Sequence, residues 1–247
     1  MAKHPFGVLI VHGFTSSLDC VRDIAPPLEA MGLPVRTPVL RGHGETPEAL
    51  RGVVWQDWVD DGAAALRDLL NEAEKAIIVG HSMGTLVTVH LAADHRGAVD
   101  SVVLAAPLVQ LASPLAPGRP FGILVPLLKR ALKKWNMPPK YAEPELAQYD
   151  TNYPWAPMEA ISQLLAFSGT TRKRLPEVSA PALILQSRND TTVAPESAEI
   201  AYREIGTAPQ DKRVIWFERT EHEMFRDCES DAVVEAVADY VQERIGA

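Results

Sequence analysis

The chain has 247 residues, and its 24 Lys and Arg against 32 Asp and Glu give a formal net charge of −8. Hydrophobic residues make up 47% of it and charged residues 23%, which is typical of a soluble globular protein and excludes intrinsic disorder. A net acidic chain without a basic tail is a poor electrostatic match for nucleic acid, and no window approaches the ~18 uninterrupted apolar residues of a membrane span.

Short apolar runs alternate with segments of helical spacing along most of the chain. In chain order, the apolar runs predict strands at 7–11, 34–40, 76–79, 99–105, 182–186 and 212–217. The segments between them predict helices at 19–31, 55–74, 82–94, 195–205 and 231–244, with a glycine-rich loop at 41–52. Strands separated by helices indicate an α/β fold with a mostly parallel sheet and helices on both faces.

This alternation breaks at Pro107 and resumes after about Phe167. The intervening segment is rich in proline, and a basic stretch runs from Lys129 to Lys134. We therefore predict a core formed by residues 1–106 and 169–247, with a cap, or lid, inserted at 107–168. Its apolar run, 121–128, has two interpretations: the wall of an acyl-chain tunnel, which we favour, or an amphipathic lid that transiently contacts lipid surfaces.

The two cysteines and the N-terminus bear on location. Cys20 and Cys228 are far apart and have neither CxxC nor zinc-site spacing, so we expect free thiols in a reducing compartment. The N-terminal residues run directly into the first predicted strand and leave no room for a signal peptide. These features predict a cytoplasmic protein.

The pentapeptide Gly80-His81-Ser82-Met83-Gly84 fits the G-x-S-x-G pattern. An apolar strand precedes it and a helix follows, which is the context that a nucleophile elbow requires. Flanking glycines leave room for the chain to pass close to itself, and the serine is exposed at the carboxyl edge of the sheet. Taken alone, the same residues also fit an ordinary helix N-cap.

A serine hydroxyl needs a base within hydrogen-bond reach, and the base needs a group that orients it. Asp190 and His222 each follow a predicted strand and come after Ser82, in the order Ser, Asp, His. Asp190 alone could be a turn residue, and His222 alone could be a surface residue. Weaker alternatives are three histidines that precede the serine and two acids at other strand positions: His12, His43, His81, Asp211 and Glu218.

Acyl transfer also needs hydrogen-bond donors for the oxyanion that forms. One is expected from the backbone N–H of Met83, directly after the serine. The loop after the first strand begins with His12-Gly13, and we assign the second donor to the backbone N–H of Phe14. An ordinary turn at the end of the strand is the alternative explanation of this loop.

The chain resembles the α/β-hydrolase superfamily, and more narrowly the small bacterial carboxylesterases and monoacylglycerol lipases. The segments that carry the resemblance are 11–15, 41–44, 57–58, 80–84, 181–188 and 205–206. The resemblance implies an α/β-hydrolase fold, a small cap, and an oxyanion hole formed by Phe14 and Met83. It further matches Glu145 to a cap glutamate that contacts the glycerol hydroxyls in monoacylglycerol lipases, although a solvated glutamate is the simpler reading.

The predicted function is hydrolysis of short- to medium-chain carboxylic esters, including monoacylglycerols, through an acyl-enzyme on Ser82. This acyl-transfer chemistry implies no metal and no organic cofactor. Enzymes of the same fold that act on other bonds stay open: a thioesterase, a lactonase, a C–C hydrolase or an acyltransferase. A non-catalytic receptor for a small ligand is disfavoured by the intact serine, aspartate and histidine. The sequence does not indicate an oligomeric state.

Overall fold

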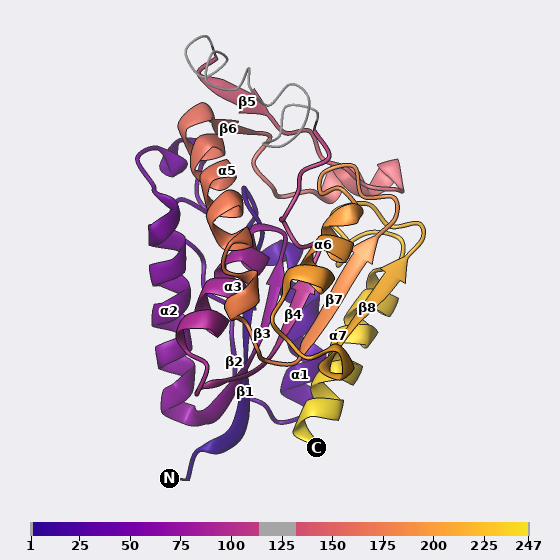
Figure 1. The fold of residues 1–247 in the computed structure, drawn as a ribbon. Helices are drawn as coiled ribbons and strands as arrows, with labels where there is room; N and C mark the ends of the chain where they lie inside the picture. Colours follow the sequence, from indigo (N-terminus) through magenta and orange to yellow (C-terminus); the bar gives the residue numbers. More distant parts are fainter. Residues whose placement is uncertain (1, 114–131, 247) are drawn as a thin grey trace.

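A computed structural model describes residues 2–113 and 132–246 of the chain. Its centre is a six-stranded sheet in the order β2-β1-β3-β4-β7-β8, in which every pair of neighbours is parallel (Figure 1). The strands are β1 (His4–Val11), β2 (Val35–Arg36), β3 (Ala73–His81), β4 (Val99–Ala105), β7 (Ala182–Ser187) and β8 (Lys212–Phe217). The predicted fold class is confirmed.

Successive strand residues point to opposite faces of the sheet, and both faces are covered. Leu9 and Ile78 pack on one side, in a core shared with α2 (Trp55–Glu72), α3 (Met83–Asp94), α5 (Met158–Arg172) and α6 (Glu196–Glu204). Ile10 and Ile77 pack on the other, with α1 (Ala25–Ala30) and α7 (Ser230–Ile245). Burial on both faces explains why the inner strands β1, β3, β4 and β7 contain continuous apolar runs rather than alternating ones.

Two predicted elements are shorter than expected, and proline explains both. The predicted helix at 19–31 is two 3-10 turns, Leu18–Cys20 and Arg22–Ile24, followed by α1, which has its two prolines in the first turn. Proline is tolerated there because those N–H groups have no partner inside the helix. The predicted strand at 34–40 pairs only over β2, since Pro34 and Pro38 cannot donate to a ladder.

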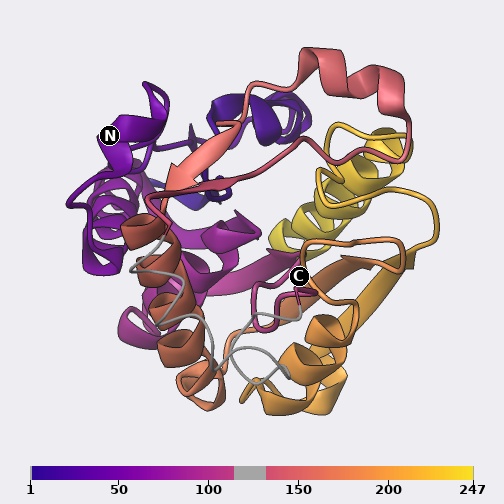
Figure 2. The ribbon, with the colours of Figure 1, turned by 90° about the horizontal axis from the view of Figure 1, so that it is seen from above.

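Residues 132–157 cross the carboxyl ends of the strands (Figures 1 and 2). There β5 (Lys134–Asn136) pairs antiparallel with β6 (Trp155–Pro157), and a 3-10 helix, Pro144–Tyr149, lies between them. Helix α5 begins inside the predicted cap but packs on α2 and α3 of the core. The division at 107–168 remains a prediction.

The apolar run 121–128 lies outside the described residues, as do Lys129 and Arg130. The two interpretations of that run, and the expected cytoplasmic location, therefore remain predictions. No helix within residues 2–113 and 132–246 is both long enough and apolar enough to cross a membrane. The described part of the chain also contains the 3-10 helices Pro47–Leu50, Leu175–Glu177 and Pro209–Asp211.

Candidate active site

Ser82 occupies the sharp turn between β3 and α3. Its backbone has φ 53° and ψ −116°, a region that costs a non-glycine residue on the order of 1–3 kcal/mol. Neighbouring glycines make the turn possible: a Cβ on Gly84 would lie 2.1 Å from the Val11 carbonyl oxygen, and one on Gly80 would lie 2.4 Å from Thr88 Oγ1. The backbone is therefore held in a strained conformation that presents the serine at the edge of the sheet.

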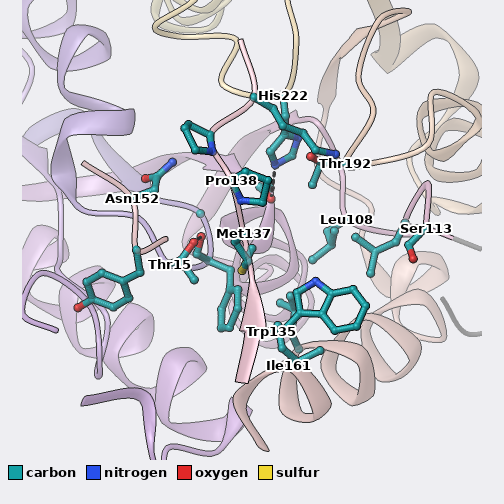
Figure 3. Close-up of a pocket in the computed structure, with 18 of the residues that line it drawn as sticks. Thr15, Leu108, Ser113, Trp135, Met137, Pro138, Asn152, Ile161, Thr192 and His222 are labelled. Atoms are coloured by element: carbon teal, nitrogen blue, oxygen red, sulfur yellow. Dashed lines mark hydrogen bonds between the residues drawn. The ribbon is translucent and has the colours of Figure 1, made fainter. Parts of the chain in front are cut away.

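His222 connects Ser82 to Asp190. Its Nε2 is 2.9 Å from Ser82 Oγ, a contact that Figure 3 marks by a dashed line, and its Nδ1 is 2.9 Å from Asp190 Oδ2. A carboxylate only accepts, so Nδ1 carries the proton and Nε2 is left to accept from the serine hydroxyl. Three residues that are distant in sequence thus form one continuous hydrogen-bonded chain.

Asp190 is itself held in place by the backbone that follows it. Its Oδ1 accepts hydrogen bonds from the N–H groups of Thr192 and Val193, each at 2.8 Å. Burial raises the pKa of Asp190, but its contacts with His222 and with these N–H groups outweigh burial and lower the pKa overall. The carboxyl group is therefore ionised and oriented toward the imidazole.

The same pairing determines the basicity of His222. Burial lowers the pKa of this imidazole, but the Asp190 carboxylate, together with Glu223 and Glu221, outweighs burial and raises the pKa above its usual value. A buried Asp190 thus stabilises the positive charge that His222 acquires when it takes a proton. This is the property that a general base acting on a serine hydroxyl requires.

The loop after β1 approaches the elbow closely. A Cβ on Gly13 would lie 3.3 Å from Ser82 Cβ. His12 fixes this loop, because its Nδ1 donates to the Gly13 carbonyl at 2.8 Å while its Nε2 accepts from the Leu40 N–H at 3.1 Å. Phe14 follows and lines the same pocket as Ser82.

Met83 is the first residue of α3. The N–H groups of a helix's first turn have no acceptor within the helix, and the helix dipole favours negative charge beside them. Of the two residues predicted to supply the oxyanion donors, Met83 directly follows the serine and Phe14 lines the same pocket. Their role as donors remains a prediction.

The alternative bases and acids have other roles in the structure. Burial lowers the pKa of His12 to about 4, and those of His43 and His81 to about 3, so all three are neutral at pH 7. Glu218 is exposed and pairs with Arg188 at 3.1 Å. Asp211 ends a 3-10 helix that precedes β8, at the opposite end of that strand from His222.

A pocket of about 490 Å³ opens onto Ser82 and His222. Trp135 and Ile161 lie at the opposite end of the Figure 3 view from His222, and Asn152 lies to one side. Most of the wall is apolar: Leu108, Leu111, Trp135, Met137, Met158, Ile161, Leu164 and Leu165. Polar side chains gather near His222 and include Asp150, Asn152 and Glu223.

Glu145 does not join this site, and the prediction of a substrate contact there is not supported. It is exposed on the 3-10 helix Pro144–Tyr149 and does not line the pocket. The chain re-enters the pocket wall only five residues later, at Asp150 and Asn152. A short sequence match identifies a segment, but the turn of that segment decides which side chain faces inward.

Acidic side chains around His222 were not predicted as part of the site. Asn152 Nδ2 donates to Glu223 Oε1 at 3.0 Å, and Ser16 Oγ donates to Asn152 Oδ1 at 2.6 Å. Asp227 accepts from the backbone N–H of Ala142 at 2.8 Å, which ties the predicted cap to the histidine loop. The sequence signal was present, since acids flank His222 on both sides.

Comparison with known proteins places the chain in a family. The profile of the α/β-hydrolase family described as "Serine aminopeptidase, S33" matches residues 3–229. The chain belongs to this family. It is therefore an α/β hydrolase, and the resemblance seen in the sequence is confirmed.

Individual relatives cover almost the whole chain. A thermostable monoacylglycerol lipase from Bacillus sp. (strain H-257) is 25% identical over 98% of this chain and 92% of its own length. A carboxylesterase from Bacillus subtilis (strain 168) is 26% identical over 95% of this chain and 92% of its own. A solved structure from work on LipS and LipT, two metagenome-derived lipolytic enzymes, has a TM-score of 0.87 at 27% identity, covering 98% of this chain and 95% of that one.

Proposed function

We propose that this α/β hydrolase is a serine carboxylesterase that cleaves short- to medium-chain carboxylic esters, including monoacylglycerols. The observation that carries the proposal is the continuous chain from Ser82 Oγ through His222 to Asp190, with 2.9 Å at each contact. Relatives named as a monoacylglycerol lipase and a carboxylesterase support the same substrate class.

In the proposed mechanism, Ser82 Oγ attacks the ester carbonyl carbon while His222 Nε2 takes its proton. The N–H groups of Phe14 and Met83 stabilise the oxyanion, and removing one such donor typically costs about 2.7–4 kcal/mol. The intermediate collapses, the C–O bond breaks, and His222 returns the proton to the leaving alcohol. Water, deprotonated by the same imidazole, then hydrolyses the acyl-enzyme and releases the acid.

The pocket has two chemically different regions, which suit the two parts of such an ester. The apolar wall that includes Leu111, Met137 and Ile161 can hold an acyl chain. The polar region beside His222, with Asn152 and Asp150, offers hydrogen-bond partners to an alcohol that carries further hydroxyls. We therefore propose that these two residues, rather than Glu145, contact the alcohol part of a monoacylglycerol.

Covalent labelling tests the nucleophile. A fluorophosphonate is expected to label the wild-type protein and not Ser82→Ala. The control is Ser113→Ala, which changes a serine that also lines the pocket but lies apart from the His222 contact. Labelling that persisted in Ser82→Ala, or an unlabelled wild type, would contradict the proposal, and the second outcome would favour a ligand receptor.

A substrate panel tests the bond that is cleaved. p-Nitrophenyl esters, monoacylglycerols and acyl thioesters of matched chain length are compared by kcat/KM. Oxygen esters are expected to be hydrolysed well. Fast turnover of thioesters together with inert oxygen esters would overturn the proposed substrate class while leaving the nucleophile intact.

A further inference from the structure

Two buried side chains, Cys20 and His81, and the partly buried Glu223 bring metal-binding groups together beneath the candidate active site. One donor atom from each of Cys20, His81 and Glu223 lies within 4.8 Å of the other two. Cys20 is 2% exposed and His81 is 1% exposed. They come from the 3-10 turn after β1, from the end of β3, and from the loop after β8.

The hydrogen bonds of His81 determine which form of its ring is present. Its Nε2 lies 3.0 Å from the backbone carbonyl oxygen of His222, to which it can only donate. The neutral ring therefore carries its proton on Nε2, and Nδ1 has a free lone pair. This Nδ1 is buried and has no hydrogen-bond partner within residues 2–113 and 132–246.

Glu223 presents a second unsatisfied acceptor. Its Oε1 accepts from Asn152, but its Oε2 is buried and lacks a partner in the described part of the chain. Two acceptors cannot satisfy each other, and leaving buried polar atoms unpaired costs on the order of 1–3 kcal/mol each. A proton or a cation between His81 Nδ1 and Glu223 Oε2 would satisfy both acceptors.

The third member of the cluster favours a cation of a particular kind. A thiolate, an imidazole nitrogen and a carboxylate oxygen are each ligands that zinc takes in proteins. Burial raises the pKa of the Cys20 thiol to about 12, while contacts from Ser16 and the Gly13 backbone oppose that rise. Those contacts favour the thiolate, which is the form that a bound metal stabilises.

We propose that Cys20, His81 and Glu223 bind a thiophilic divalent cation of the zinc class. On binding, the Cys20 S–H bond breaks, the sulfur coordinates the metal, and the proton leaves to solvent. His81 and Glu223 line the pocket, which provides a route for the ion and a fourth position for water. Zinc ligand distances of about 2.0–2.3 Å separate tetrahedral ligand atoms by roughly 3.3–3.8 Å. Side-chain shifts of about 1 Å therefore complete the site.

Cobalt(II) serves as the spectroscopic probe of the site. We expect wild-type protein, purified with chelator, to bind one equivalent of Co²⁺ with a thiolate-to-metal charge-transfer band that stoichiometric Zn²⁺ abolishes. The matched control is Cys228→Ser, which removes the other free cysteine and should retain the band. Cys20→Ser should lose the band while folding normally.

A second variant keeps the test decisive if Cys20→Ser does not fold. Glu223→Gln keeps the acceptor for Asn152 and removes the carboxylate charge, so Zn²⁺ affinity should fall by at least about tenfold, a loss that outer-shell changes already produce. No band in the wild type, a band that persists in Cys20→Ser, or one lost in Cys228→Ser would overturn the metal site. The readout does not depend on esterase activity, so it stands apart from the proposed function.

Discussion

Replacing Glu223 by glutamine should stabilise the metal-free protein, and increasingly so as the pH rises. Burial raises the pKa of Glu223 from 4.5 to about 7, with nearby Asp150 contributing. Between those two values the folded state binds more protons than the unfolded state, so this group makes stability fall as the pH rises. Glutamine stays neutral, keeps an oxygen for Asn152, and can donate its amide hydrogen toward His81 Nδ1.

The size of the effect follows from the shift in pKa. A difference of about 2.5 pKa units corresponds to about 3 kcal/mol at pH values above both pKa values. At pH 5 the unfolded carboxyl is only partly ionised, and the expected gain is under about 1 kcal/mol. Urea unfolding of Glu223→Gln and the wild type at pH 5 and 8.5, with chelator present, measures both values.

The control for this experiment is Glu145→Gln, which neutralises an exposed carboxylate of the predicted cap. Its unfolding free energy should stay within about 0.5 kcal/mol of the wild type at both pH values. The reasoning about Glu223 is refuted if Glu223→Gln changes stability equally at pH 5 and 8.5, or lowers it at the higher pH.

Three further predictions test the site and its frame. Asp190→Asn should lower kcat by about 10⁴-fold. It should also move the pH at which kcat/KM rises to a lower value, because the carboxylate that raises the pKa of His222 is lost. An unchanged pH profile would argue against this pairing. Gly84→Ala should abolish folding, as judged by circular dichroism, because the added Cβ would lie 2.1 Å from the Val11 carbonyl oxygen. Gly97→Ala should be tolerated, because a Cβ at that position has no heavy atom within 4 Å. Asn152→Ala should raise the KM for monoacylglycerols about tenfold, which is the cost of one lost hydrogen bond, and should leave the KM for p-nitrophenyl esters little changed. An equal effect on the KM of both substrates would contradict the proposed role of Asn152.

The sequence predicted the core of the fold well because each element there has a local cause. The strand at 99–105 has the bounds that its apolar run indicates, since both faces of a central parallel strand must be apolar. The strand at 212–217, at the edge of the sheet, also has its predicted bounds. The errors are equally local. Pro34 and Pro38 shorten β2, a consequence that the proline content of 34–40 could have indicated.

The convergence of Ser82, Asp190 and His222 was predictable for a topological reason. Each residue follows a strand, and parallel strands that share one sheet bring their carboxyl ends to one edge regardless of the chain length between them. This prediction requires only that the strands are correctly located in the sequence. It does not need the loops, and the structure places the three side chains in hydrogen-bond contact.

The residues around Ser82, Asp190 and His222 could not be predicted from the positions of the strands. Whether Glu145 or Asn152 faces the pocket depends on how a 3-10 helix turns, and no apolar periodicity constrains that turn. The state of His81 depends on one bond to a carbonyl 141 residues away. Chain order correctly set aside the histidines that precede the serine, but it gave no role to any of them.

The hydrogen bonds in the structure show what His12 and His81 do, and the acids near His222 have an effect on its pKa. His12 holds the loop that begins the predicted oxyanion hole, and His81 holds the backbone of His222. Glu221 and Glu223 each help to raise the pKa of His222, so they stabilise the charged imidazole that forms during acyl transfer. Glu223 does so only while it is ionised. A proton or a metal ion on its carboxyl should therefore weaken the base, which links the proposed metal site to the proposed chemistry through one side chain.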